Sequence, residues 1–503
     1  MRVDKQTIFQ APKPFSSTPS KPEASPNLQP PQPPIPPESQ RRVPPPTSPP
    51  PQTPQGLSPS TPPSEPPVKR NFFSIRFLRL LVGLITTVFV IFLLFLIVSR
   101  FFGGKEKTVT LIYWGLWEDP NVVSQVISDF ERQNPNIKID YSKQDIKDYR
   151  ERLSTRIKEG SGPDIFRFHN SWYPMLSEYL LPLPQSVITK DEFVKNYYPV
   201  TRYDLVKKGA IYGIPLHIDT LALYVNREMF EAAGLSPPKT WEEFRDVAYS
   251  LTVKDEEGNI KTTGAGLGTF ENVSHAPDII SLLLIQNGVD VYKLSLDQRL
   301  YDTLDFYTSF AREGQSIWNS TLDNSLVAFS KGNLAMFFGY SWDLFTIRAL
   351  NPDLAFEVIP VPQLDIDAPK NFSSYWAEGV SSESKHKKES FLFMEFLARK
   401  DTQEKLFTEA SKVRPFGELY SDVSLADRLK DNEDVYAFLI QAPNAYSSYF
   451  VADTYDNGLN EKLNNYLKDA INFVLSGGSV ESASETLIQG YNQVLETYEN
   501  KKE

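Results

Sequence analysis

Residues Leu80–Ser99 form an uncharged run of 20 mostly apolar residues, LLVGLITTVFVIFLLFLIVS. At ~1.5 Å per residue a helix of this length is ~30 Å long, which matches the hydrocarbon core of a bilayer. The run is longer than the apolar part of a cleaved signal peptide, and no A-x-A site follows it. We therefore predict one permanent transmembrane signal anchor, residues 76–102, that divides the chain in two.

The charges on either side of this run indicate its orientation. Four positive residues come directly before it and three come after it: Lys69, Arg70, Arg76 and Arg79, then Arg100, Lys105 and Lys107. The more positive flank of a membrane helix tends to stay in the cytoplasm. We expect a cell-membrane, single-pass protein whose N-terminus is cytoplasmic and whose residues after about 103 lie outside.

The segment before the anchor is rich in proline. Residues 1–70 hold 23 of the 40 prolines of the chain. Such a composition cannot bury enough apolar surface to offset chain entropy, so we predict a disordered tail with local polyproline II structure. The tail either binds an adaptor domain with an aromatic groove or serves as a spacer.

The segment after the anchor is acidic and globular in composition. Residues 108–503 carry 39 Lys and Arg against 58 Asp and Glu, which argues against nucleic acid as a partner. The chain has no cysteine, which excludes thiolate catalysis and Cys-ligated metals. Its four histidines are far apart in sequence, so we expect neither a metal site nor a cofactor.

Apolar periodicity predicts an α/β fold for this segment. A strand at 107–113, a helix at 120–133 and a strand at 137–141 indicate a βαβ unit with a parallel sheet. Further helices are predicted at 145–159, 191–206, 239–252, 277–287, 297–313, 387–398, 401–410 and 458–475, and short strands at 211–216, 222–226 and 357–360. The segment is too long for one core and should form two lobes.

Local turn chemistry is clearest in residues 212–244. A helical turn over Arg227–Ala233 should end at Gly234 in a left-handed conformation. Thr240 should cap the next helix, with Glu243 as its capping-box partner.

Several segments, in order, resemble one family. They are PNIKIDY (135–141), GSGPDIFRFHNSW (160–172), YGIPLHIDTLALYVNREMFEAAGLSPPKTWEEF (212–244), FSKGNLAMFFGYSWDL (329–344), FEVIPVPQ (356–363) and WAEGVSSESKHKKESFLFMEFL (376–397). The set resembles the extracellular solute-binding proteins of ABC importers, and within them the carbohydrate-binding group.

The resemblance implies a two-lobe periplasmic-binding-protein-like fold with a ligand cleft between the lobes and hinge crossings near 217–221, 374–378 and 430–445. Lobe 1 would contain about 108–217 and 378–430, and lobe 2 about 220–375 and 440–503. A monomer of this kind would deliver a carbohydrate to ABC permease subunits. A separate subunit would hydrolyse ATP, since this chain has no GxxxxGK[ST] phosphate loop.

Several aromatic residues lie where predicted strands pass into loops, the place where open α/β sheets bind ligands. Sugars need aromatic platforms and hydrogen-bonding polar groups, and the resemblance assigns such roles to several positions. The candidates are Trp117, Glu118, Phe168, Asn170, Asp219, Trp342, Trp376 and Glu378. The alternatives are a hinge hydrogen bond for Asp219, a core position for Trp342, and a hinge role for Trp376 and Glu378.

Some neighbouring residues are weaker candidates. His169 reads as a loop histidine with internal partners, and Asp164 as the anchor of its turn. His217 and His275 stand out less than Asp219, as does Tyr455 late in the chain.

Two other functions stay open on the sequence alone. A membrane-tethered glycoside hydrolase could use Glu118 or Asp119 with Asp219 as acid and base, but nothing sets their separation and no nucleophile motif is present. A membrane-tethered sensor for an extracellular solute would need an output module, and the tail shows no known signalling pattern. We therefore expect a binding protein and not an enzyme.

Overall fold

The computed structural model describes residues 80, 83–94, 108–314 and 316–499. Residues 80 and 83–94 are helical and belong to a different unit of the chain from residues 108–499. Within the described ranges no helix is both long and apolar enough to cross a membrane. The predicted tail and both flanks of the predicted anchor lie outside these ranges, so the anchor stays a prediction.

The first lobe is built on a five-stranded mixed sheet of order β2-β1-β3-β13-β6. Its strands are β1 (Val109–Gly115), β2 (Ile137–Lys143), β3 (Ile165–His169), β6 (Ile214–Pro215) and β13 (Trp376–Val380). Strand β1 pairs parallel with β2 and β3, and helix α2 (Pro120–Gln133) connects β1 to β2. The predicted βαβ unit is thereby confirmed. Strand β13 runs antiparallel between β3 and β6.

The second lobe is built on a five-stranded sheet of order β11-β7-β10-β9-β8. Its strands are β7 (Ala222–Asn226), β8 (Val253–Lys254), β9 (Ile260–Ala265), β10 (Leu334–Gly339) and β11 (Phe356–Ile359). Every residue of β7 and β10 is buried, which shows that helices and loops cover both faces of this sheet.

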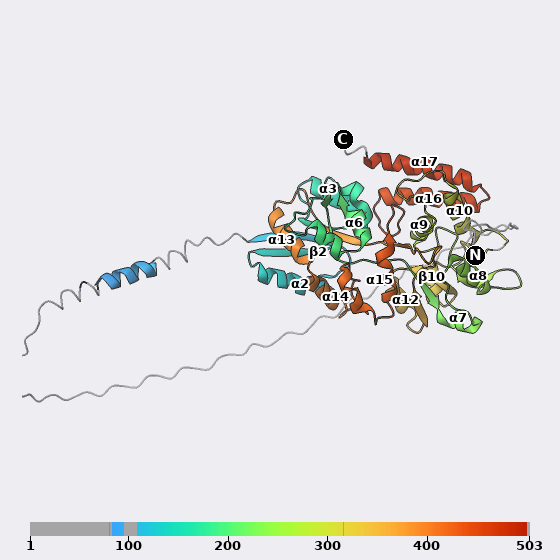
Figure 1. The fold of residues 1–503 in the computed structure, drawn as a ribbon, viewed down its shortest axis with the longest axis horizontal. Coiled ribbons are helices and arrows are strands. Elements are labelled where there is room, and N and C mark those ends of the chain that lie inside the picture. Colours follow the sequence, from blue (N-terminus) through green and yellow to red (C-terminus); the bar gives the residue numbers. More distant parts are fainter. Residues whose placement is uncertain (1–79, 81–82, 95–107, 315, 500–503) are drawn as a thin grey trace, which may run out of the picture. The chain divides into compact units, whose positions relative to one another are not determined.

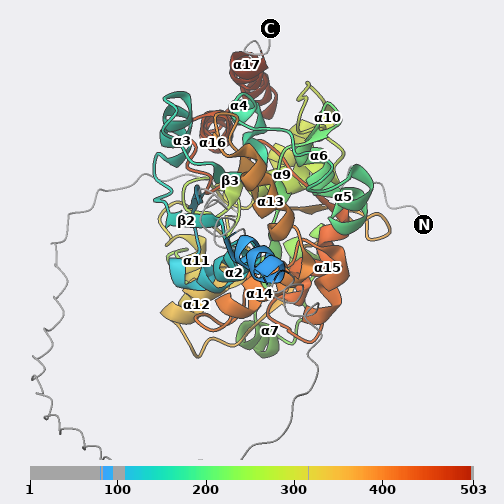
Figure 2. The same cartoon turned by 90° about the vertical axis from the view of Figure 1, so that its left-hand side faces the viewer.

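Separate groups of helices surround the two sheets (Figure 1). Around the first sheet lie α3 (Tyr149–Lys158), α4 (Tyr173–Leu176), α5 (Lys190–Asn196), α6 (Pro199–Leu205), α13 (Lys387–Leu397) and α14 (Lys400–Ala410). Around the second lie α7 (Arg227–Ala233), α8 (Trp241–Ser250), α9 (Ala276–Gln286), α10 (Gln298–Ser309), α11 (Ser325–Ser330), α12 (Asp343–Leu350) and α15 (Tyr436–Gln441). The last two helices, α16 (Leu459–Leu475) and α17 (Val480–Glu499), lie side by side in both views (Figures 1 and 2).

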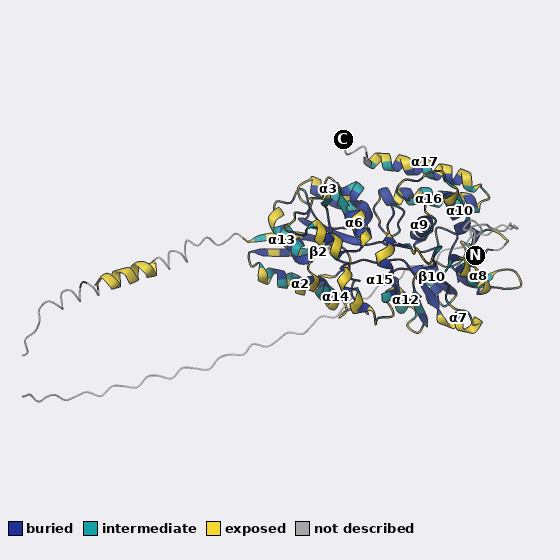
Figure 3. Ribbon diagram, viewed as in Figure 1, coloured by how far each residue is buried: buried dark blue, intermediate teal, exposed yellow. Residues whose placement is uncertain are grey.

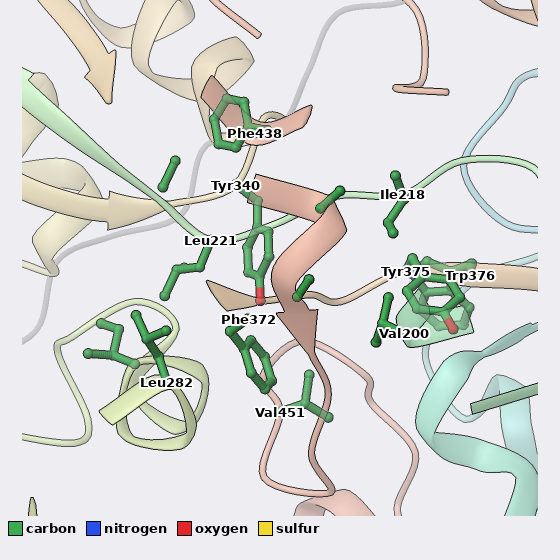
Figure 4. Packing of buried hydrophobic residues seen from close by; sticks show 14 of the residues in the cluster. Val200, Ile218, Leu221, Leu282, Tyr340, Phe372, Tyr375, Trp376, Phe438 and Val451 are labelled. Atoms are coloured by element: carbon green, nitrogen blue, oxygen red, sulfur yellow. The ribbon is translucent and has the colours of Figure 1, made fainter. Parts of the chain in front are cut away.

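The chain passes between the lobes three times. Residues 216–221 connect β6 to β7, residues 373–375 connect β12 (Asn371–Phe372) to β13, and residues 411–435 lead from α14 to α15. Strand β12, which comes directly before the second passage, pairs with β14 (Ala445–Tyr446), which follows α15. Figure 4 shows Leu221 of the first passage in the same buried cluster as Phe372 of β12, Phe438 of α15 and Tyr340. The crossings are therefore part of one continuous apolar core.

Local signals for turns and caps are confirmed. Gly234 ends α7 with φ of 65°, and the Thr240–Glu243 capping box is complete at the start of α8. Strands β3 and β13 of the first sheet and β7 and β10 of the second are buried throughout, whereas β1, β2 and β8 include exposed residues. Helices such as α17 also carry many exposed residues (Figure 3).

The predicted helix over 191–206 is wrong in one respect, because the structure has two helices there. Residues 197 and 198 are extended, and Pro199 begins α6. A proline has no N–H to donate into a preceding turn and disfavours helical conformation in the residue before it. Helix α17 and the buried strand β10 were not predicted from the sequence.

Candidate functional site

A cavity of about 380 Å³ lies between the lobes, at the level of the three crossings. Its lining comes from strand ends of both sheets and from the crossings themselves. The lining residues are Trp117, His169, His217, Ile218, Asp219, Tyr340, Trp342, Phe345, Ser374, Trp376, Arg414, Glu418, Ala452, Asp453 and Tyr455. Its volume falls in the range of small-molecule sites, and aromatic side chains with a few polar groups are the usual lining of such sites.

The first lobe contributes an aromatic wall made by Trp117 and Trp376. Trp117 follows β1 and is 38% exposed. Its ring meets that of Trp376 edge to face, with centroids 5.4 Å apart. Trp376 is itself buried against Trp172 and His169, at 5.1 and 5.0 Å. The wall is therefore rigid, and Trp117 is its exposed surface.

The second lobe contributes an indole platform at Trp342. This residue precedes α12, is 38% exposed, and stacks on Tyr340 with centroids 4.3 Å apart and planes 15° apart. The hydroxyl of Tyr340 donates to Asp278 Oδ1 at 2.7 Å, which holds the Tyr340 ring in place under the indole of Trp342. One face of Trp342 is thus held by the protein, while its exposed part lines the cleft.

Asp219 lies at the bottom of the cleft, in the first crossing, and is 4% exposed. Its carboxylate accepts hydrogen bonds from the backbone N–H groups of Thr220 and Ser341, at 2.8 and 3.1 Å, and from the Ser341 hydroxyl at 2.5 Å. Burial raises the pKa of this carboxyl, and the three donors offset that rise only in part. The alternative role that the sequence left open for Asp219, a hydrogen bond at the hinge, is therefore present in its bonds to Ser341.

A polar wall comes from the third crossing. Arg414 Nη2 donates to Glu418 Oε1 at 2.5 Å, and the guanidinium lies over the Phe345 ring at 5.5 Å. Nearby, His217 is buried, and its Nδ1 has no hydrogen-bond partner among the described residues. Burial lowers the pKa of His217, so the ring is neutral near pH 7.

His169 forms part of the cleft floor. Its Nδ1 and Nε2 lie 2.7 and 3.0 Å from the hydroxyls of Ser171 and Ser374. Burial lowers its pKa to about 3, so this histidine is also neutral. The interpretation of His169 as a histidine with internal partners is confirmed, although the residue also lines the cleft.

Two predicted carboxylates lie away from the cleft lining. Glu118 and Glu378 are buried on either side of Arg167, whose Nη1 lies 2.5 Å from Glu118 Oε2 and whose Nε lies 2.7 Å from Glu378 Oε1. Residues Glu378 and Arg167 face each other across the β13–β3 pair. Both carboxylates therefore neutralise a core arginine.

Phe168 and Asn170 also lie outside the lining. Phe168 is fully buried in β3 against Phe166, with ring centroids 6.2 Å apart. Asn170 is buried and donates to Asp204 Oδ2 at 2.9 Å. Of the eight predicted residues, Trp117, Asp219, Trp342 and Trp376 line the cleft.

Some polar and aromatic lining residues were not predicted from the sequence: Tyr340, Ser374, Arg414, Glu418 and Asp453. The aromatic pair in GYSWDL was a usable signal for Tyr340, because it lies two residues from Trp342 at the end of β10. The other residues lie in irregular segments without periodicity. Within the described residues, no group of acidic or histidine side chains is arranged to hold a metal ion.

Two α/β lobes, three crossings and an aromatic cleft at the hinge define a two-lobe periplasmic-binding-protein fold. Residues 116–404 match the bacterial extracellular solute-binding protein family. Because this match covers more than half of the chain, the chain belongs to that family. Its members bind solutes and are not enzymes, which argues against the glycoside hydrolase alternative.

Individual relatives are similar to this chain over 74–78% of its length. The "Multiple sugar-binding protein" of Streptococcus mutans is 25% identical over 407 residues, 74% of this chain and 91% of its own length. The sugar-binding protein MalE from Xanthomonas citri has a TM-score of 0.63 and 20% identity, covering 78% of this chain and 100% of that one. The GacH receptor of Streptomyces glaucescens, also solved in complex with acarbose, has a TM-score of 0.60 and 20% identity, covering 78% and 99%.

Proposed function

We propose that the chain is the substrate-binding component of an ABC importer and that its ligand is a neutral sugar or short oligosaccharide. The observation that carries this proposal is that two half-exposed indoles, Trp117 and Trp342, line one cleft from opposite lobes. A sugar ring has apolar C–H faces and a hydroxyl rim, and this lining suits both. The names of the relatives, which refer to sugars and to acarbose, support the same ligand class.

The charges of the cleft favour a neutral ligand. Glu418 is paired with Arg414, and Asp453 lies 3.1 Å from a ring nitrogen of His275. Asp219 already accepts three hydrogen bonds, and His169 and His217 are neutral. An anionic ligand would find no unpaired positive charge in this lining to offset its desolvation, because Arg414 and, beside the lining, His275 are each held by carboxylates.

Transport follows from the arrangement of the lobes. A ligand that touches Trp117 and Trp342 at once stabilises the closed state more than the open one, because the open state offers only one wall. The closed form would dock on permease subunits that open the cleft, while a separate subunit hydrolyses ATP. The chain would work as a monomer outside the cell.

Calorimetry tests the ligand class. The full-length chain in detergent is titrated with maltose, maltotriose, mannobiose, arabinotriose and, as the charged comparison, D-glucuronate. We expect at least one neutral saccharide to bind without turnover, and more tightly than glucuronate. No binding to any neutral saccharide, or preference for the anion, would overturn the proposal.

We also propose that residues 80–99 anchor the protein as one membrane helix. The support is the uncharged apolar run and the positive charge before it. In membrane fractionation the full chain should remain in the pellet after an alkaline carbonate wash, and a variant lacking 80–99 should be soluble. Deleting residues 11–68 is the control and should leave the protein in the pellet. Release of the full chain by carbonate would contradict the anchor.

A further inference from the structure

The loop over residues 451–457, between β14 and α16, contains an unusual backbone. Asp453, Tyr455 and Asn457 have φ of 57°, 48° and 46°, a left-handed conformation that is uncommon in residues other than glycine. Residues held in this way persist only where their surroundings fix them, and they cluster at functional sites. Asp453 and Tyr455 both line the cleft.

Contacts to both lobes hold this loop. On the second lobe, the N–H of Ala452 donates to Asp278 Oδ2 at 2.9 Å. On the first lobe, Arg150 Nε donates to the Asp456 carbonyl at 2.6 Å, and Asn457 Nδ2 donates to Asp148 Oδ1 at 2.7 Å. The loop is therefore a fixed part of the cleft wall.

His275 makes a further contact with this loop, an ion pair with Asp453. It precedes α9, is buried, and lies between two carboxylates: Nε2 is 2.8 Å from Asp343 Oδ2, and Nδ1 is 3.1 Å from Asp453 Oδ2. The Nε2 contact is a hydrogen bond, whereas Nδ1 meets Asp453 at ion-pair distance without hydrogen-bond alignment. A neutral imidazole carries one N–H and would turn a lone pair toward one of the two carboxylates, so this position favours the protonated ring. A third acid, Asp278 of α9, also lies near His275. The rings of Tyr340 and Trp342 pack against the imidazole ring of His275, with centroids 5.0 and 6.3 Å away.

The electrostatics agree with this geometry. Burial acts to lower the pKa of His275, but Asp343 and Asp453 outweigh it and hold the pKa well above 6.5. Burial raises the pKa of Asp278 to about 6, and its carboxylate is engaged by Tyr340 and Ala452.

Asp453 remains available to a ligand. Its side chain is 52% exposed, and while Oδ2 faces His275, Oδ1 has only a 3.5 Å contact with the Tyr455 hydroxyl among the described residues. A carboxylate fixed through one oxygen can accept a ligand hydroxyl through the other.

We propose that Asp453 accepts a hydroxyl of the bound sugar through Oδ1, and that His275 is the positioning residue that holds Asp453 and its loop against the Trp342 platform. This rests on the proposed function for the ligand contact, whereas the His275–Asp453 pairing is independent of it. In this proposal, the His275–Asp453 ion pair and the loop over residues 451–457 take part in binding a neutral ligand.

Binding to variants tests the contact. With maltotriose, or the tightest neutral saccharide of the calorimetric series, Asp453→Asn and His275→Gln should each weaken binding about 10- to 100-fold. The double variant should lose no more than either single one, because both remove the same contact. Asp323→Asn, which removes an exposed ion pair with Lys331 away from the cleft, is the control and should bind normally. Unchanged affinity in Asp453→Asn, or additive losses, would overturn the proposal.

Histidine NMR tests the positioning without a ligand. The chain has four histidines, so ¹⁵N-histidine labelling gives four ring systems, and His275 is assigned by its loss in His275→Gln. It should be doubly protonated at pH 7.5, and Asp453→Asn should lower its pKa. Should His275→Gln fail to fold, the Asp453→Asn comparison still identifies the responding ring. A neutral His275, or one insensitive to Asp453→Asn, overturns the pairing; absence of all saccharide binding overturns the proposed function instead.

Discussion

Replacing Arg167 with methionine is expected to lower the free energy of unfolding by about 3–5 kcal/mol. Arg167 is 2% exposed, and it neutralises Glu118 and Glu378, which are also buried. The methionine fills similar volume, so the loss comes from two carboxylates left without a cation and not from a cavity. Thermal and urea unfolding of the full-length chain, monitored by tryptophan fluorescence, measure the effect.

The pH dependence of this effect has a defined sign. Burial raises the pKa of Glu378, and Arg167 offsets that rise in part. Without Arg167 the folded-state pKa rises further above the unfolded value of about 4.3, so ionisation favours unfolding as the pH increases. The destabilisation should be larger at pH 8 than at pH 5.

Two comparisons isolate the charge effect. The triple variant Arg167→Met with Glu118→Gln and Glu378→Gln should recover part of the lost stability, because no buried carboxylate remains unpaired. Arg156→Ala breaks only an exposed pair with Glu159 and should change stability by less than about 0.5 kcal/mol. A loss below about 1 kcal/mol in Arg167→Met, independent of pH, would show that the triad is not the electrostatic centre of the first lobe.

Trp342→Ala is expected to weaken saccharide binding about 30- to 100-fold, which corresponds to ~2–3 kcal/mol. The indole is 38% exposed and held flat on Tyr340, so it is pre-organised to stack on a sugar ring. Because the residue is partly exposed, its removal should alter stability little. Calorimetry with the tightest neutral saccharide measures the loss.

Variants of the same cleft separate stacking from burial. Trp342→Phe keeps an aromatic face and should lose less affinity than Trp342→Ala, whereas Trp117→Ala should resemble Trp342→Ala from the opposite lobe. Tyr203→Ala removes an exposed aromatic ring away from the cleft and should bind normally. Normal affinity in both Trp342→Ala and Trp117→Ala would remove the aromatic clamp from the mechanism.

Local chemistry was predictable where a single segment determines it. The capping box at Thr240, the left-handed Gly234 and the βαβ unit each depend on residues within one or two turns. Trp117 was predictable as a cleft residue because it follows a predicted strand, and strand ends face the ligand in such sheets. Trp342 was assigned through the family resemblance of its segment, since the strand β10 before it was not predicted.

Partners distant in sequence were not predictable. Glu378 is opposite Arg167 only because β13 inserts beside β3, although the two residues are 211 positions apart in the sequence. The sequence therefore indicated that Glu118 and Glu378 were free to bind a ligand, whereas each is paired with Arg167. His275, Asp343 and Asp453 come from three segments of the second lobe and the loop beside it, and nothing in their spacing indicates that they meet.

The strand order of the first lobe has a consequence for biosynthesis. Strand β13 lies between β3 and β6, yet it follows the entire second sheet in the sequence. At ~5–20 residues per second, the ribosome needs about 10–30 s to pass from Pro215 to Trp376, and during that time β3 has an unpaired edge and β6 has no neighbour. The second sheet, made from residues 222–359 without interruption, can assemble within this delay. The second sheet should therefore assemble before β13 completes the first sheet.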